Sequence, residues 1–333
     1  MATRGYSGYK GRKSPWKIVA AILLVLVILA AAGVLMLQKY LVYDASGTPH
    51  LRLPGQEEIK TPSSSGGASS SGDLGPVDVT IDPPERQSVL GYLLTAPNAD
   101  LTPYLAPDGD LNAVAVTLKG ADGQLRTDWQ DDETLKSVLS DESRHTIARI
   151  SCFLDGANAR SQVKEMGLEN TGGYIFYDAT NRNWLDPGKP AAREFLLDLI
   201  RQAAEAGFDE ILLTEVFYPT EGKLDKIAYS ADRTESLTLF LTEAKGLLTD
   251  YPGVTLSVAV TDTLLLDGED ETSGQSLSGF AALADAIYAL CEGGDYEAAK
   301  AAVAEAAGGK TTAFVALFDG VGYPPEEYLI PEA

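Results

Sequence analysis

The sequence predicts an α/β barrel of the TIM type, together with a single N-terminal transmembrane helix. Apolar residues recur at helical spacing across residues 190–206, and Gly207 then suits the left-handed conformation that often ends a helix. The short apolar run 211–213 follows almost at once and is typical of a strand buried on both faces. A helix followed by such a strand is the repeating unit of a parallel α/β sheet, and residues 86–331 fit the roughly 250 residues typical of such a barrel.

The N-terminal segment predicts a membrane anchor. Residues 1–17 contain five basic residues and no acidic one, and Ile18 to Leu37 is a run of twenty apolar or glycine residues. At 1.5 Å per residue, a helix over that run is about 30 Å long, which matches the hydrocarbon core of a bilayer. The basic flank predicts a cytoplasmic tail at residues 1–17 and an extracytoplasmic barrel at the cell membrane. A cleaved signal peptide is the alternative, but its apolar region is usually about 7–15 residues.

Three segments are expected after the membrane span. Residues 38–54 are expected to form a juxtamembrane hairpin, and residues 55–85 a linker rich in Ser, Gly and Pro that cannot bury enough apolar surface to order itself. Residues 86–333 then form the barrel domain. Residues 1–43 contain six cations and no acid, so the formal charge of −22 for the whole chain becomes −28 for the remainder. Such acidity argues against nucleic acid as a partner.

The chain contains two cysteines and two histidines. Cys152 and Cys291 could pair in an oxidising compartment, but each follows an apolar, strand-like run, which favours two buried free thiols. His50 and His145 are the only histidines, so the sequence disfavours a histidine-rich zinc site and a Ser-His-Asp triad. No nucleotide-binding or metal-binding motif occurs, so the sequence predicts no cofactor and no metal.

Seven strands are expected in the barrel, and helical patterns separate most of them. The expected strands are residues 89–95, 113–118, 146–153, 211–214, 255–260, 286–290 and 312–318, and the expected helices are residues 132–139, 191–206, 235–249, 277–284 and 296–307. An eighth strand is not evident, because residues 320–333 are short and rich in proline. The sequence therefore leaves open whether the barrel is complete or lacks one strand.

Several stretches resemble a known family. The matching stretches are Leu111–Lys119, Ile147–Phe153, Trp184–Pro187 and Gly207–Ile211, followed in order by Tyr218-Pro219 and Gly274-Gln275. On these stretches, which cover most of residues 88–290, the chain resembles a glycoside hydrolase family of TIM barrels that has long been known as a domain of unknown function. The resemblance implies a barrel distantly similar to those of the α-amylase type. The spacing between Trp184–Pro187 and Gly207–Ile211 is its most specific element.

The chain departs from this family at the ends of three strands. The family typically has aspartates in the second strand where this chain has Thr117 and Gly120. In the fourth strand, Thr214 replaces the family's aspartate and Phe217 its arginine. The fifth strand, Leu256–Val260, contains no acidic residue at all. Carboxylates that the resemblance implies at the ends of three strands are therefore absent together.

Glycoside hydrolysis ordinarily needs two carboxylates, about 5–5.5 Å apart for retention or about 6.5–9.5 Å apart for inversion. Glu215 and Asp155 are the candidate catalytic acids. Glu215 lies next to the missing aspartate, but side chains alternate along a strand, so a shift of one residue aims it away from the original site unless the strand end bulges. Asp155 follows the third strand at a position where the resemblance implies an aspartate. A salt bridge at the rim or a solvated carboxylate is the alternative for Glu215.

A second group of residues is expected to bind substrate. Arg149 could bind a substrate oxygen or carboxylate, or form a structural ion pair. Asp186 could line a pocket, although Asp-Pro-Gly is also a routine turn signal. Core packing is the alternative for the aromatic candidates. Asp209 and Glu210 are expected to be structural, since they begin their strand. The predicted substrate-binding residues are Arg149, Lys119, Thr117, Thr214, Trp184, Asp186, Tyr92 and Tyr218.

These observations predict a membrane-anchored, extracytoplasmic, glycoside-hydrolase-like barrel. It is expected to engage cell-wall or extracellular glycan, with weakened or lost hydrolytic activity because three strand-end acids are missing. One alternative is an active glycosidase that uses Glu215 with a relocated second acid. The other is a non-catalytic module that binds a protein partner.

Overall fold

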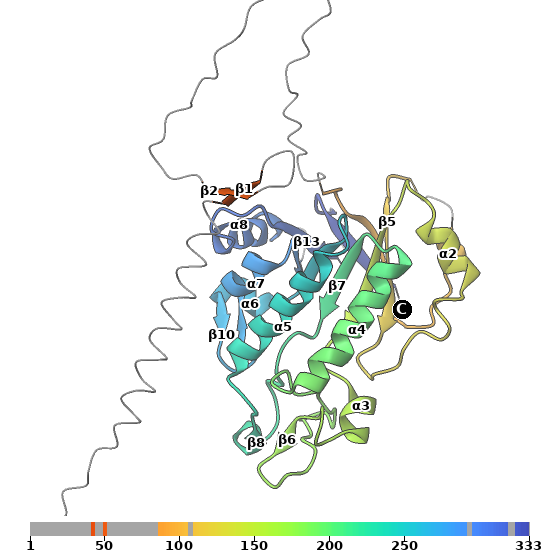
Figure 1. Cartoon of the computed structure of the whole chain (residues 1–333). Helices are drawn as coiled ribbons and strands as arrows, with labels where there is room; N and C mark the ends of the chain where they lie inside the picture. Colours follow the sequence, from red (N-terminus) through yellow and green to blue (C-terminus); the bar gives the residue numbers. More distant parts are fainter. Residues whose placement is uncertain are drawn as a thin grey trace, which may run out of the picture. The chain divides into compact units, whose positions relative to one another are not determined.

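The computed structural model describes residues 41–43, 49–51, 86–105, 109–291, 295–318 and 324–332. The chain divides into two compact units, residues 1–79 and residues 80–333. In the first unit, β1 (Leu41–Tyr43) and β2 (Pro49–Leu51) pair in antiparallel fashion, with Leu41 opposite Leu51 (Figure 1).

No helix among the described residues is long and apolar enough to cross a bilayer. The predicted membrane span, residues 18–37, lies outside the described residues, as do the predicted linker at 55–85 and the cytoplasmic tail at 1–17.

The second unit is a closed barrel of eight parallel strands, which confirms the predicted TIM-type fold (Figure 1). Neighbouring strands around the barrel follow the order of the chain, and the last pairs with the first. The strands are β3 (Leu90–Leu94), β4 (Ala113–Lys119), β5 (His145–Ser151), β7 (Glu210–Thr214), β9 (Thr255–Ala259), β12 (Ala286–Leu290), β13 (Ala313–Leu317) and β14 (Tyr328–Glu332).

The barrel is complete, a point that the sequence left open, because β14 is an eighth strand and closes it. β14 pairs with β3 from Tyr328 to Glu332, and with β13 only up to Leu329. Pro331 has no backbone N–H and cannot donate a ladder hydrogen bond. Since pairing with β13 ends at Leu329, no donor is needed at Pro331 on that side. A proline-containing strand is therefore tolerated at this position.

Helices cover the outside of the barrel (Figure 1). The helix predicted at residues 190–206 is confirmed, with proline in its first turn and Gly207 in the left-handed region (φ 96°) at its end. Two short helices, α3 and α6, were not predicted. The helices are α2 (Glu133–Leu139), α3 (Gly156–Ser161), α4 (Pro190–Ala206), α5 (Arg233–Leu248), α6 (Asp262–Asp267), α7 (Leu277–Leu283) and α8 (Tyr296–Ala306), with 3-10 turns η1 (Thr102–Tyr104) and η2 (Leu224–Lys226).

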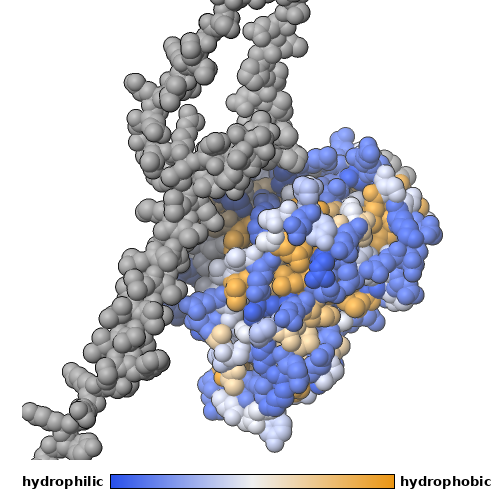
Figure 2. Space-filling view, viewed as in Figure 1, coloured by the Kyte–Doolittle hydropathy of each residue, from blue (hydrophilic) through white to orange (hydrophobic). Residues whose placement is uncertain are grey.

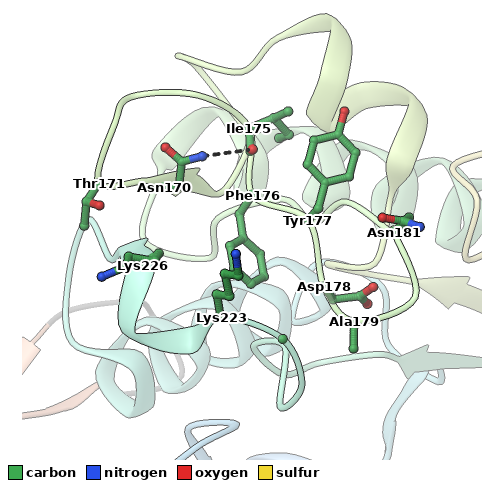
Figure 3. A pocket seen from close by; sticks show the side chains of 11 residues that line it. Asn170, Thr171, Ile175, Phe176, Tyr177, Asp178, Ala179, Asn181, Lys223 and Lys226 are labelled. Atoms are coloured by element: carbon green, nitrogen blue, oxygen red, sulfur yellow. Dashed lines mark hydrogen bonds between the residues drawn. The ribbon is translucent and has the colours of Figure 1, made fainter.

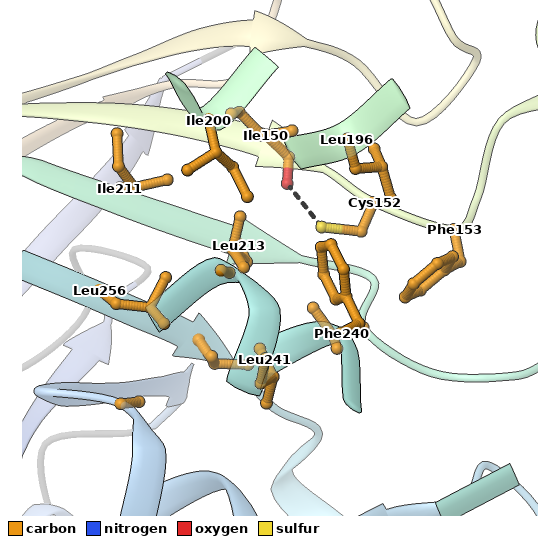
Figure 4. Close-up of a cluster of buried hydrophobic side chains, with 14 of the residues drawn as sticks. Ile150, Cys152, Phe153, Leu196, Ile200, Ile211, Leu213, Phe240, Leu241 and Leu256 are labelled. Atoms are coloured by element: carbon orange, nitrogen blue, oxygen red, sulfur yellow. Dashed lines mark hydrogen bonds between the residues drawn. The ribbon is translucent and has the colours of Figure 1, made fainter. Parts of the chain in front are cut away.

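The larger apolar core lies between the strands and these helices. Figure 4 shows strand side chains such as Ile211 and Leu213 facing Ile200 of α4 and Phe240 of α5, and all four are fully buried. The outer surface of this layer is largely hydrophilic in the view of Figure 2, with apolar side chains gathered in seams between the helices. Burial of this layer between sheet and helices is the main source of the domain's stability.

The barrel interior holds a second apolar cluster, formed mainly by alanine, leucine and β-branched residues of the strands. A buried polar network around Glu210 lies at the N-terminal end of the barrel strands. The Glu210 carboxylate lies 2.7 Å from Nε2 of His145 and accepts a 2.6 Å hydrogen bond from Tyr288. Burial acts to raise the pKa of Glu210, but the hydrogen bond and charge of His145 and the charge of Arg86 outweigh it and hold the pKa below its ordinary value.

Asp209 and Glu210 therefore both have structural partners, as their position at the start of β7 predicts. Asp209 accepts hydrogen bonds from the backbone N–H and the hydroxyl of Thr146, at 2.8 and 2.7 Å. These bonds tie the start of β7 to the start of β5. Both acids lie at the end of the barrel opposite to the strand ends where barrel enzymes place their sites.

Gly91 of β3 lies against the backbone of β4, and any side chain there would collide with it. A Cβ at position 91 would lie 1.9 Å from the carbonyl oxygen of Ala113. We expect Gly91→Ala to destabilise the domain by about 1–3 kcal/mol, because the two strands must separate locally. Urea unfolding checks this, with Gly246→Ala on α5 as control, since a Cβ at Gly246 meets no atom within 4 Å. Equal stability of the two variants would contradict the tight approach.

Candidate functional site

The C-terminal mouth of the barrel brings together four of the predicted residues. They come from the ends of three neighbouring strands: Thr117 of β4, Arg149 of β5, and Thr214 with Glu215 at the end of β7. Arg149 Nη2 lies 3.5 Å from Glu215 Oε1, and Arg149 Nη1 lies 3.3 Å from the hydroxyl of Thr117. The hydroxyl of Thr214 donates a hydrogen bond to the Glu215 carboxylate. We refer to these four residues as the mouth group.

Glu215 reaches the mouth because its backbone adopts a left-handed conformation (φ 51°). A non-glycine residue in this region is uncommon and is worth examining as a sign of function. Had β7 continued in extended form, the side chain after Thr214 would point to the other face of the sheet. The left-handed residue turns the carboxylate back toward Arg149. The shift of one residue from the family's aspartate is thereby compensated, although by a left-handed residue rather than by a bulge.

Two members of the mouth group, Arg149 and Glu215, are partly open to solvent, whereas Thr117 and Thr214 are buried and Thr117 donates a 2.7 Å hydrogen bond to the carbonyl of Leu94. The side chains of Arg149 and Glu215 are 14% and 21% exposed. The bonds of Arg149 to Glu215, to Thr117 and to the Thr95 carbonyl are all 3.3–3.5 Å long, near the limit for a hydrogen bond. The partly exposed guanidinium of Arg149 and carboxylate of Glu215 are a donor and an acceptor that sugar hydroxyls can use. The arrangement can therefore bind a polar ligand, and it has one ionisable acid.

Asp155, the second predicted acid, does not lie open at the mouth. Its carboxylate lies 3.1 Å from Nζ of Lys119, and both side chains are fully buried. It also caps α3 by accepting hydrogen bonds of 2.8 Å from the backbone and the side-chain amide of Asn158. Gly123 packs over the carboxylate, since a Cβ there would lie 2.1 Å from an Asp155 oxygen. Asp155 and Lys119 thus form a structural ion pair that substrate does not reach.

Asp186 and Tyr218 lie together, but both are buried. The hydroxyl of Tyr218 donates to Asp186 Oδ1 at 3.2 Å, and the backbone N–H of Gly188 donates to the same oxygen at 3.0 Å. Burial raises the pKa of Asp186 despite these bonds. Burial first, and then the negative charge of Asp186, raises the pKa of Tyr218. These residues fix the turn before α4 and form no open surface.

The other two aromatic candidates also have packing roles. Trp184 is buried, donates from its indole N–H to Asp178 at 3.1 Å, and packs against the ring of Phe217 at 5.4 Å between centroids. Tyr92 lies in the middle of β3 with its ring 5.2 Å from that of Tyr104 on η1. Neither belongs to the mouth group.

Cys152 and Cys291 do not pair with each other in a disulfide. Cys152 is fully buried in the layer between strands and helices, and this burial raises the pKa of its thiol well above the ordinary value. Cys291 is only half-buried, so the expectation of two buried thiols holds for Cys152 alone. No group of three or more potential metal ligands occurs among the residues that the structure describes.

One pocket at the carboxyl end of the barrel was not anticipated from the sequence. It is lined by segments 170–181 and 222–226, which follow β5 and β7, and has a volume of about 650 Å³ (Figure 3). The adjacent aromatic residues Phe176 and Tyr177 and the lysines Lys223 and Lys226 were the available signals. Because these residues lie about 45 positions apart in the sequence, it could not be predicted that they line the same pocket.

Comparisons with known proteins concern both the sequence and the fold. The family profile described as "Putative glycosyl hydrolase domain" matches residues 104–307, more than half of the chain. No curated protein matches the chain.

Similar solved structures include a hypothetical protein from Ruminiclostridium thermocellum ATCC 27405, at 24% identity over 51% of this chain and 96% of that one, with a TM-score of 0.42. They also include the PgaB (BpsB) glycoside hydrolase domain from Bordetella bronchiseptica, at 14% identity over 62% and 74% of the two chains, with a TM-score of 0.46. A third is the glycoside hydrolase domain of PelA from Pseudomonas aeruginosa, at 15% identity over 69% and 83%, with a TM-score of 0.44.

The profile match confirms the family resemblance suggested by motifs such as Trp184–Pro187 and Gly207–Ile211. The matched residues include the strands β4, β5 and β7 and the whole mouth group. The chain therefore belongs to the family described as "Putative glycosyl hydrolase domain".

Proposed function

We infer that the barrel binds glycan at its C-terminal mouth and that its hydrolytic activity is weak or lost. The main support is the composition of the mouth group. Arg149 pairs there with one carboxylate, Glu215, while threonines occupy the two neighbouring positions at which the family has aspartates. Asp155 is fully buried against Lys119.

The chemistry of glycoside hydrolysis explains why this matters. One carboxyl group must donate a proton to the leaving oxygen while the other attacks or activates water. Thr117 and Thr214 are buried and cannot ionise at physiological pH, so they cannot replace an acid. A binding function requires only donors and acceptors, and the mouth group provides both.

A second candidate function is an active glycosidase that uses Glu215. The left-handed conformation of Glu215 favours it, because a strained backbone at a strand end is more typical of functional sites than of scaffold. Its partially exposed carboxylate could act as acid or nucleophile if a second acid approached with the substrate. A non-catalytic module that binds a protein partner is the third reading.

The proposed location is the outer face of a cell membrane. The support is the predicted span Ile18 to Leu37 behind a basic tail, which favours a cytoplasmic N-terminus. An anchor of this kind would keep the barrel near the cell wall, where polysaccharide is abundant.

The full chain should bind glycan without appreciable turnover. On a panel of aryl glycosides and cell-wall polysaccharides, we expect binding by at least one glycan and little or no release of product. Arg149→Ala should weaken that binding about tenfold, because a charge-assisted hydrogen bond contributes about 1.5–3 kcal/mol. Arg201→Ala is the matched control, since Arg201 lies exposed on α4 with Asp198 as its partner.

The variant Glu215→Gln distinguishes the active glycosidase from the glycan-binding barrel without hydrolytic activity. Turnover by the wild type that disappears in Glu215→Gln would establish the active glycosidase and contradict the silent binder. Binding that persists without turnover in both would support the proposal. A folded chain that neither binds nor cleaves any glycan of the panel would direct the search to protein partners.

A further inference from the structure

We propose that the pocket between residues 170–181 and 222–226 binds the anionic group of a sugar, a carboxylate or a sulfate. The inference rests on the proposed glycan function, because it adds a charged subsite at the same end of the barrel. The two lining segments follow β5 and β7, the strands whose ends carry Arg149 and Glu215.

The walls of the pocket are built by backbone pairing. β6 (Glu169–Asn170) pairs in antiparallel fashion with β8 (Ile227–Ala228), and the N–H of Thr171 donates to the carbonyl of Lys226 at 2.7 Å. The Asn170 side chain accepts hydrogen bonds from the backbone of Gly172 and Tyr174. The pocket therefore exists before a ligand arrives, which lowers the entropic cost of binding.

Gly222 fixes the position of Lys223 relative to the opposite wall. Its φ is +107°, and a Cβ there would lie 3.1–3.2 Å from the backbone of Asp178 and Ala179. Only glycine adopts this conformation without strain and allows so close an approach. The two segments are thus in direct contact at one edge of the pocket, beside the lysines (Figure 3).

The charges that line the pocket leave a net cation. Asp178 is the one acidic lining residue, and its carboxylate accepts hydrogen bonds from Arg182 at 2.8 Å and from the indole of Trp184 at 3.1 Å. Lys226 pairs with Asp225 at 2.8 Å, but both side chains are well exposed, so that pair is weak. The ammonium group of Lys223 has no hydrogen bond or ion pair with any residue that the structure describes. Lys223 is an exposed residue of this lining, and in a chain with a net charge of −22 a lysine without an ion pair to a described acid is a local site for an anion.

The remaining lining groups suit a sugar. Tyr177 is 49% exposed, and its ring offers an apolar face for stacking. The Thr171 hydroxyl and the Asn181 amide make no side-chain hydrogen bond within the described part of the chain and can bind sugar hydroxyls. The volume of about 650 Å³ lies within the usual range for small-ligand sites. An aromatic face, neutral polar groups and one free cation together fit an anionic sugar.

Binding of matched oligosaccharides to the full chain tests this assignment. The probes are an oligogalacturonate hexasaccharide, its methyl-esterified form, which has the same backbone without the charge, and a chondroitin sulfate hexasaccharide. We expect tighter binding of an anionic probe than of the esterified one, and a loss of about tenfold in Lys223→Gln. Lys223→Arg should keep the affinity, and Lys136→Gln on α2 is a control for an exposed lysine at a distant element. The carboxylate and sulfate probes distinguish the two sources of charge.

The outcomes separate this inference from the proposed function. Equal binding of the charged and esterified probes, or no binding of either anionic probe, would overturn the anionic subsite. Preference for the anionic probe that is lost in Arg149→Ala but unchanged in Lys223→Gln would place the anion at the mouth, and would also overturn it. Preference that depends on Lys223 but not on Arg149 would support the pocket while contradicting glycan binding by the mouth group.

Discussion

Asp155→Asn should lower the free energy of unfolding of the barrel domain by about 3–5 kcal/mol. The substitution keeps the size of the side chain and a residue type that caps helices well, so it removes mainly the charge opposite Lys119. A fully buried ammonium that loses its carboxylate partner is left uncompensated in a medium of low dielectric constant, and losses of this size are typical. Urea unfolding of the full chain, followed by tryptophan fluorescence, measures the change.

Two controls make this result specific. Asp225→Asn removes a carboxylate from an exposed pair with Lys226 and should change the free energy of unfolding by no more than about 0.5 kcal/mol. Lys119→Met combined with Asp155→Asn removes both buried charges and should be more stable than Asp155→Asn alone. Unchanged stability of Asp155→Asn together with lost hydrolytic activity would instead establish Asp155 as a catalytic acid.

Glu210→Gln should cost about 3–5 kcal/mol of folding free energy at neutral pH. The carboxylate is fully buried, lies 2.7 Å from His145 and accepts a 2.6 Å hydrogen bond from Tyr288. A neutral amide weakens or loses the two buried hydrogen bonds with His145 and Tyr288, and each hydrogen bond to a charged group contributes about 1.5–3 kcal/mol. Glu133→Gln is the matched control, because Glu133 lies on the surface in an i,i+3 pair with Lys136 and should contribute little.

The effect of Glu210 should depend on pH in a defined direction. Its folded-state pKa lies below the ordinary value of 4.5, so its stabilising contribution is fully present above about pH 4.5 to 5 and is lost as the pH falls through the folded pKa. The difference in stability between the wild type and Glu210→Gln should therefore shrink on acidification. A difference that stays constant from pH 7 to about pH 3 would show that Glu210 has the same pKa in the folded and unfolded protein, and would contradict the lowered folded-state pKa.

The sequence predicted most of the barrel because its units repeat a simple physical pattern. Apolar runs separated by amphipathic helices located seven strands, and the helix from Pro190 to Ala206 was placed with its terminal Gly207. The strand β14 was not predicted, because a proline such as Pro331 disfavours a strand when the sequence is considered alone. Only the neighbours of Pro331 show that no N–H is needed there on the side of β13.

The site was predicted less well, since side-chain direction depends on single backbone residues. Alternation along β7 predicted Glu215 to point away from the mouth, and one left-handed residue reversed this. Position along the strands predicted Lys119 as a substrate-binding residue and Asp155 as a catalytic acid. It could not show that they bury each other, which depends on Gly123 and on the start of α3.

The amino-acid sequence by itself determined the class of fold, the acidic charge and the family, because these depend on composition, periodicity and short motifs. The tertiary structure alone decided which carboxylates are open to a ligand and which are buried. It also decided that Lys223 and Tyr177 line one cavity. Burial and partnership are properties of residues distant in the chain, such as Arg149 with Glu215, and no local pattern encodes them.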